Sequence, residues 1–180
     1  MGGGAMMFDY DNASQAELIQ RAKRGDARAF SRLYAQIYKN LYRFALYMTK
    51  HPQDAEDAVS EAVISAFENM KALKKEESFR SWMFTILNNQ CKKAMRIGQR
   101  EKARLSENGT YQIAEEPDYA QWHDVRRAFD ALDEEERMIV AFSVFGGYKS
   151  EEIAGMLDRN AATVRSRKSR ALEKMRSALS

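Results

Sequence analysis

The 180-residue chain contains 29 Lys and Arg against 26 Asp and Glu, and 44% of its residues are hydrophobic. This composition supports one medium domain or two small ones and excludes a wholly disordered chain. One cysteine, Cys91, excludes an internal disulfide, and with only two histidines no zinc-ligand spacing exists. No apolar run approaches the roughly 20 residues that span a bilayer, so we expect no membrane insertion.

Charge is distributed in blocks, although the net charge is only +3. Residues 51–70 contain five acids and no Lys or Arg, and residues 115–136 contain nine acids against two Arg. Residues 80–104 and residues 159–176 each contain seven basic residues against one acid. Two basic blocks separated by acidic ones indicate two separate anion-binding surfaces.

Residues 1–13 are expected to be disordered, and the Gly-rich start reads as an added leader, which makes Met6 or Met7 the native first residue. After it, long stretches of 3.6-residue periodicity with only two prolines predict an all-α protein. Ser14 and Glu17 form a capping-box pattern that opens a short first helix. Three further helices are predicted, at Asp26–Thr49, Pro52–Met70 and Ser78–Met95.

The helix predicted at Pro52–Met70 has one apolar face and one acidic face. The acidic face carries Asp54, Asp57, Glu61 and Glu68, with Ile64 among them. Acids around an outward apolar residue suit docking of a basic protein surface. A plain solvated face explains the acids near the helix start but not Ile64, and both interpretations remain open from the pattern. A carboxylate metal site is disfavoured because no His, Cys or Gly-rich loop accompanies these acids.

The helix predicted at Ser78–Met95 has a polar far side. Hydroxyl, amide, cationic and aromatic groups share this surface, at Ser81, Trp82, Thr85, Asn88, Asn89, Lys92, Lys93 and Arg96. Such groups suit phosphate contacts, base-edge hydrogen bonds and base stacking. Trp82 fits a core position equally well, and Cys91 is predicted to be a buried structural thiol.

Periodicity fails after Arg96, and residues 97–117 are predicted to be a flexible linker between two domains at 14–96 and 118–180. Asp118 opens a helix to about Ala131, and a capping box at Asp133–Glu136 opens the next, which ends at Gly146-Gly147.

Residues 150–180 are typical of a helix-turn-helix. Ser150 is predicted to cap a short helix, and Asn160 to cap a long basic one after the break at Asp158. The long helix has an apolar face, and its opposite side and flanks carry Arg159, Thr163, Arg165, Ser166, Arg167 and Arg170. Such a helix enters the DNA major groove. An ordinary amphipathic helix with a basic solvated face is the alternative.

Three stretches together resemble the small extracytoplasmic-function (ECF) class of bacterial RNA polymerase sigma factors. They are Asp54-Ala-Glu-Asp-Ala-Val-Ser-Glu61, Ser78-Phe-Arg-Ser-Trp-Met-Phe-Thr-Ile86 with Asn89, and Leu132-Asp-Glu-Glu-Glu-Arg137 through Thr163-Val-Arg-Ser-Arg167. They occur in the family's order, and the match covers nearly all of the chain from Ala16 onward.

The resemblance implies two small helical domains, the family's second and fourth regions, in a protein that is not an enzyme and needs no cofactor or metal. It implies that the acidic helix docks on the clamp helices of the polymerase's largest subunit through Asp54, Asp57, Glu61 and Ile64. Residues 78–96 and the loop at 71–77 would recognise and open the −10 promoter element, with Lys74, Lys75 and Arg80 added to the polar residues named above. The helix-turn-helix would read the −35 element as duplex DNA, and the apolar segment Met138–Phe145 would meet the polymerase flap.

The family also implies an anti-sigma partner and a cytoplasmic location, at the nucleoid when active and at the membrane where the anti-sigma factor holds it there. Two positions depart from the family pattern in the helix-turn-helix. Asp158 occupies a turn position commonly filled by Gly, and Lys168 falls on the apolar face. The alternative function is a stand-alone dimeric helix-turn-helix regulator; a nucleic-acid enzyme is disfavoured because no catalytic constellation is found.

Overall fold

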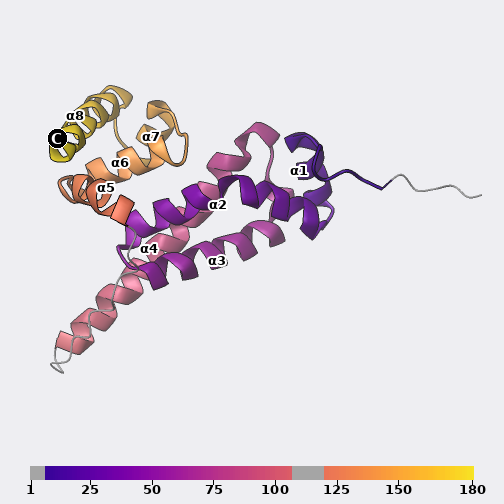
Figure 1. The fold of residues 1–180 in the computed structure, drawn as a ribbon, viewed down its shortest axis with the longest axis horizontal. Helices are drawn as coiled ribbons and strands as arrows, with labels where there is room; N and C mark the ends of the chain where they lie inside the picture. The colour runs from indigo at the N-terminus through magenta and orange to yellow at the C-terminus, as the bar shows by residue number, and fades with distance from the viewer. Residues whose placement is uncertain (1–6, 107–119) are drawn as a thin grey trace, which may run out of the picture.

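The computed structural model describes residues 7–106 and 120–180, and the regular elements in these ranges are all helical (Figure 1). The all-α prediction is therefore confirmed. The elements are α1 Gln15–Lys23, α2 Ala27–Thr49, α3 Pro52–Glu68, the 3₁₀ turns η1 Met70–Ala72 and η2 Glu76–Ser78, α4 Phe79–Ser106, α5 Ala120–Asp130, α6 Glu134–Val144, α7 Ser150–Leu157 and α8 Ala161–Leu179.

The first domain is a bundle in which α2, α3 and α4 pack on one another and α1 lies against α2 (Figure 1). The caps expected from the sequence form: Ser14 and Glu17 make a reciprocal capping box, and the Asp26 carboxylate accepts from the first backbone amides of α2. Pro52 occupies the first turn of α3, where its missing amide hydrogen is not needed. Small residues on the inner face of α3, Ala55, Ala58, Ala62 and Ala66, allow close approach to the neighbouring helices.

Residues 7–13 differ from the disordered segment that was expected. The Arg21 guanidinium lies 4.2 Å from the ring centre of Phe8, and the Tyr10 hydroxyl donates to Asp26 at 2.8 Å. Arg28 also stacks over the Tyr10 ring, at 4.4 Å. Cation–π contacts, the hydrogen bonds of Tyr10 with Asp26 and Arg21, and the ion pair of Asp11 with Arg32 therefore hold this segment on α1 and α2. Residues 1–6, including the proposed leader, lie outside the described residues.

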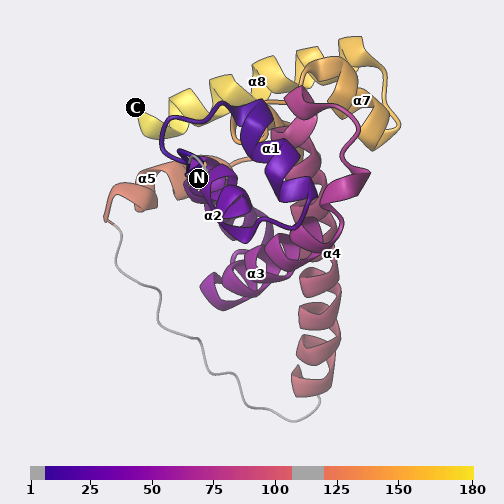
Figure 2. The same cartoon turned by 90° about the vertical axis from the view of Figure 1, so that its right-hand side faces the viewer.

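Helix α4 is longer than predicted, because it continues to Ser106 where an end near Met95 was expected. The prediction took Gly98 as a sign that the helix had ended. A single glycine, however, weakens a helix by only about 1 kcal/mol and does not terminate it. The flanking Gln, Arg, Glu and Lys residues favour helix, and no proline interrupts them. The extension projects away from the bundle (Figure 2). The rest of the predicted linker, residues 107–117, lies outside the described residues.

In the second domain, α5, α6 and α7 each pack against α8. Asp133 and Glu136 form the expected capping box of α6, and Asn160 caps α8 by accepting from the amide of Ala162 at 2.7 Å. The predicted cap of α7 is wrong by one residue, because Lys149 is the cap and Ser150 is the first helical residue. The Lys149 amide donates to Glu152 at 2.7 Å, so a carboxylate one turn ahead satisfies it instead of a serine hydroxyl.

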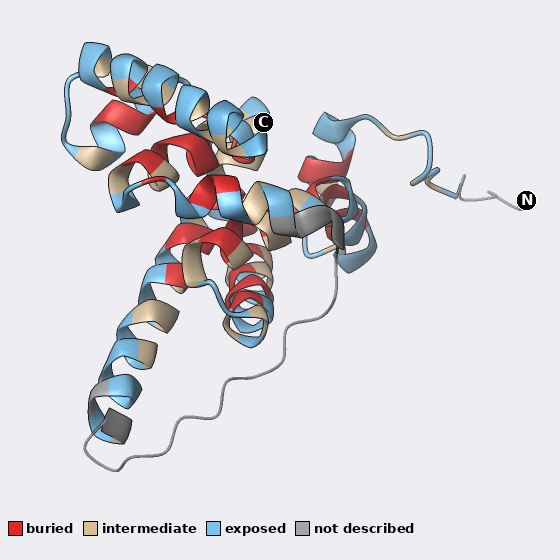
Figure 3. Ribbon diagram, turned by 60° about the vertical axis from the view of Figure 1, so that its left-hand side comes forward, coloured by how far each residue is buried: buried red, intermediate tan, exposed pale blue. Residues whose placement is uncertain are grey.

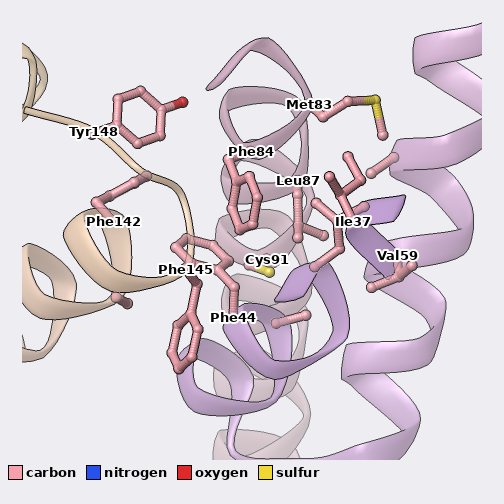
Figure 4. Close-up of a cluster of buried hydrophobic side chains, with 14 of the residues drawn as sticks. Ile37, Phe44, Val59, Met83, Phe84, Leu87, Cys91, Phe142, Phe145 and Tyr148 are labelled. Atoms are coloured by element: carbon pink, nitrogen blue, oxygen red, sulfur yellow. The ribbon is translucent and has the colours of Figure 1, made fainter. Parts of the chain in front are cut away.

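The two domains lie against each other through α2 and α6, and buried residues continue from one domain into the other (Figure 3). Phe44 of α2 is fully buried between Phe84 of α4 and Phe142 of α6, with ring centres 5.4 and 5.2 Å away (Figure 4). The sequence analysis predicted two domains joined by a flexible linker, and that prediction did not include this shared core.

Asp158 ends α7 with a left-handed backbone, φ 51°, which confirms that this position of the turn favours glycine. We expect Asp158→Gly to raise the free energy of unfolding by up to about 1 kcal/mol, since glycine adopts this conformation without side-chain strain. Thermal unfolding of both proteins measures the change. Asp158→Ala should lower stability by a similar amount, and equal stability of all three would show that the turn is unstrained.

Candidate nucleic-acid and protein interfaces

The acidic face of α3 is directed away from the bundle, as the helical pattern predicted. Asp57 and Glu61 are exposed, Asp54 is partly exposed, and Ile64 exposes 53% of its surface. Gln53 donates to Asp57 at 3.1 Å, and this contact leaves the carboxylate on the surface. The face thus combines free negative charge with an apolar side chain that the fold does not use.

The polar face of α4 is divided between exposed and covered residues. Lys74 and Lys75 before the helix, and Asn89, Lys92, Lys93 and Arg96 along it, are exposed. Trp82 is partly buried beside Phe79, so it is neither a full core residue nor a free stacking platform. Asn88 is 5% exposed, and its side-chain oxygen has no hydrogen-bond partner.

The first turns of α4 contact the second domain, which sequence reasoning missed. The Arg80 guanidinium donates to the backbone oxygen of Phe145 at 2.6 Å. The Tyr148 hydroxyl lies 2.6 Å from the Thr85 hydroxyl and donates to the backbone oxygen of Ser81. Burial raises the pKa of the Tyr148 phenol, so Tyr148 stays protonated at neutral pH.

Cys91 is a free thiol buried in the first domain, as predicted. Burial raises the pKa of its thiol to about 12, and a thiol that stays protonated at neutral pH is a poor nucleophile. Cys91 is therefore a packing residue. The described residues also contain no group of three or more His, Cys, Asp or Glu side chains that could hold a metal ion.

The outer face of α8 is exposed at Thr163, Ser166 and Arg170, opposite the buried Val164 and Ala171. Arg170 donates to the Ser166 hydroxyl at 2.8 Å, one turn earlier on the same face. Lys168 is only partly buried, which a lysine accommodates because its long stem can pack while its charge reaches water. This resolves the conflict that the sequence raised about the apolar face.

Three arginines of this face are paired with acids of the same domain. Glu135 accepts from Arg159 at 2.8 Å and lies 2.9 Å from Arg167, while Glu151 accepts from Arg165 at 2.7 Å. Glu135 was not singled out from the sequence, because the run of acids at the start of α6 does not indicate which arginines they contact. Such partly exposed ion pairs contribute little to stability, about 0–1 kcal/mol each, so an incoming phosphate can replace the carboxylate.

Two protein-family models match this chain in the order that the resemblance requires. Residues 33–101 match Sigma-70 region 2, and residues 122–175 match Sigma-70, region 4. Together the two matches span more than half of the chain. The ECF RNA polymerase sigma factor SigM of Mycobacterium tuberculosis is 29% identical over 159 residues, which is 88% of this chain and 81% of SigM.

The chain belongs to the ECF-type RNA polymerase sigma factors. This sigma factor directs RNA polymerase to promoters and is not an enzyme. The ECF RNA polymerase sigma-E factor of Escherichia coli K12 is similar as well, at 26% identity over 173 residues, covering 87% of this chain and 89% of that protein.

Two solved structures share the fold of the sigma factor. One is the sigma factor RpoE of Bartonella quintana in complex with the anti-sigma factor NepR, with a TM-score of 0.66 and 22% identity over 83% of this chain and 96% of that one. The other is CnrH in complex with the cytosolic domain of CnrY, with a TM-score of 0.62 and 22% identity over 95% and 97% of the two chains. In the described part of this sigma factor, no helix is long and apolar enough to cross a membrane.

The pairing of Glu135 with Arg159 and Arg167 yields a test of the α8 face. We expect Glu135→Gln to strengthen binding to duplex DNA and to steepen its salt dependence by roughly one unit of log–log slope for each guanidinium freed for a phosphate. Fluorescence anisotropy titrations of a labelled duplex at several salt concentrations measure this. Weaker binding by the variant would instead mean that Glu135 holds the arginines in their binding orientation.

Proposed function

We propose that the sigma factor binds core RNA polymerase through the acidic face of α3 and reads promoter DNA with α4 and α8. The observation that carries this proposal is the outward set of Asp54, Asp57, Glu61 and Ile64 on a helix whose other face is buried core. An apolar side chain surrounded by carboxylates suits a basic protein surface better than it suits water or DNA. By the family pattern, that surface is the clamp helices of the polymerase's largest subunit.

The basic face of α4 and the loop at residues 71–77 bind and open the −10 element. Its exposed cations, including Lys74 and Lys92, attract the backbone, and Asn89 offers an amide for base edges. Trp82, which is partly exposed, supplies an aromatic surface beside them. A cationic track with an aromatic side chain supports capture of an unpaired strand.

Helix α8 enters the major groove of the −35 element. Its outer residues lie on one side of the helix, and Arg170 and Thr163 are both exposed there. Arginine recognises guanine by two parallel hydrogen bonds, and threonine contacts either base edge or phosphate. Arg159, Arg165 and Arg167 flank this side and are suited to the phosphates.

An anti-sigma factor completes the proposed partners, and the sigma factor acts in the cytoplasm. Support for the partner comes from the fold shared with RpoE in its complex with NepR. An inhibitor of this class would cover the α3 face or the DNA-binding faces.

The proposal is tested by adding the purified sigma factor to core RNA polymerase that lacks any sigma factor, with a library of promoter fragments from the source genome as template. Transcripts that start at defined sites and require the sigma factor are expected. Tight binding to palindromic duplex DNA by the protein alone as a dimer, with no polymerase complex, would instead support a stand-alone regulator.

Charge reversal on α3 tests the polymerase contact. We expect Asp57→Arg with Glu61→Arg to abolish co-elution with core polymerase and to leave the helical circular dichroism unchanged, because both side chains are exposed. Glu56→Arg is the control, since it reverses the charge of an exposed acid of the same helix that lies outside this face. Equal loss in both variants would show a general charge effect and no defined docking face.

Arg170→Ala tests base recognition by α8. We expect a loss of about 1–3 kcal/mol in promoter binding, confined to one base position, because a bidentate arginine contact discriminates by that amount. Binding of the holoenzyme to promoter variants substituted across the −35 element measures it. A uniform loss across all sequences would make Arg170 a phosphate contact.

A further inference from the structure

The loop at residues 71–77, which the proposed function assigns to the −10 element, contains acids that oppose DNA binding. Residues 74–77 are two lysines followed by two glutamates, so their net charge is zero. In a freely moving loop the carboxylates would pair with the neighbouring ammonium groups and repel phosphates. The structure shows a different arrangement, because Lys74 and Lys75 form no ion pair with any described residue.

Glu76 is turned toward α1 instead. The Gln20 side-chain amide donates to the Glu76 carboxylate at 2.5 Å. The Gln15 amide donates to the backbone oxygen of the same glutamate at 3.5 Å, a longer contact. Two glutamines of one helix therefore meet the middle of the loop, where Glu76 is partly buried while Lys74 and Lys75 are exposed.

Both ends of this segment are anchored in the core of the first domain. Leu73 before it and Phe79 after it are 3% and 2% exposed. Helix α1 also packs against the 3₁₀ turns η1 and η2 (Figure 2). The contact of Gln20 with Glu76 is a third attachment between these anchors, and it acts on residues that core packing leaves at the surface.

Helix α1 is a fixed base for this contact. Leu18 and Ile19 on its inner face are buried, and Arg21, which follows Gln20, pairs with Asp26 at 2.7 Å. A side chain on a packed helix holds its geometry more precisely than one on a loop. The Gln20 amide also carries no charge, so it bonds the carboxylate without adding a charge that would compete with the loop lysines for a phosphate.

From these contacts we infer that Gln20 is a positioning residue for the −10 loop, which holds Glu76 on α1 and leaves Lys74 and Lys75 unpaired for the phosphates of the open strand. The inference rests on the proposed function, because it takes this loop as part of the −10 surface. Without the Gln20 amide, Glu76 pairs with the lysines, and the loop loses positive charge although its own sequence is unchanged.

Hydrogen exchange measured by NMR on the full-length chain tests whether Gln20 holds the loop. The Ser78 amide donates to the backbone oxygen of Lys75 at 3.0 Å and reports on opening of this segment. We expect it to exchange roughly three- to tenfold faster in Gln20→Ala, the range for loss of one hydrogen bond. Alanine favours helix, so α1 itself stays folded. Gln36→Ala, at an exposed glutamine of α2, is the matched control. Equal exchange in wild type and Gln20→Ala would overturn the inference.

Binding of a fluorescent single-stranded 20-mer of mixed sequence, at several salt concentrations, tests the effect on the lysines. We expect Gln20→Ala to bind roughly two- to fivefold more weakly, the effect of one exposed ion pair. Its log–log salt slope should fall by roughly 0.7, the value for one phosphate contact on a single strand. Gln36→Ala should match wild type. An unchanged slope would refute the inference at any affinity, because the lysines would then still carry their full charge.

Removal of the carboxylate separates positioning from direct contact. In a Glu76→Gln background, Gln20→Ala should change neither the affinity nor the salt slope, because no acid remains to pair with the lysines. A persistent loss would mean that Gln20 touches the strand itself, and the positioning role would be wrong. Failure of the proposed function is seen separately, as absence of sigma-dependent transcripts in the reconstitution with core polymerase while the Ser78 amide still exchanges faster in Gln20→Ala.

Discussion

The burial of Phe44 is the interaction on which the arrangement of the sigma factor depends. Its ring lies where α2, α4 and α6 meet, between Phe84 and Phe142, and none of the three rings is exposed to solvent. Because aromatic rings bury large areas and favour edge-on packing, this one contact fixes both the bundle of the first domain and the approach of the second. The polar contacts at Arg80 and Tyr148 can form only because this packing brings α6 close to α4.

Attraction between oppositely charged segments of the same chain is the second constraint on the fold. The alternating charge blocks of the sequence meet within the second domain, where the acids at the start of α6 lie against the arginines of α8. Glu136, which is 6% exposed, caps α6 and also binds Lys174 at 2.6 Å, so its charge is compensated twice. Glu135 pairs with Arg159 and Arg167, which the proposed function assigns to DNA phosphates. The acids at the start of α6 therefore neutralise part of the positive charge at the start of α8.

Local features of the fold followed from the sequence, because caps and faces depend on neighbours a few residues away. The capping boxes at Ser14 and Asp133 and the outward Ile64 were all predicted from the sequence. Other contacts join residues far apart in the sequence, and a local pattern of hydrophobic and polar residues does not predict them. Arg80 and Phe145 are 65 positions apart, and Thr85 and Tyr148 are 63 positions apart. Tyr148 was overlooked for this reason, since a lone tyrosine after two glycines is typical of an ordinary turn.

The unexpected length of α4 has a consequence for where the second domain can begin. A helix rises 1.5 Å per residue, so residues 96–106 advance the chain by roughly 15 Å along a fixed direction. Whatever path residues 107–119 take, they bridge Ser106 to Ala120 across roughly 50 Å at most. The end of α4 therefore sets the point from which the chain continues, and the number of residues from 107 to 119 sets the greatest distance from it at which α5 can begin.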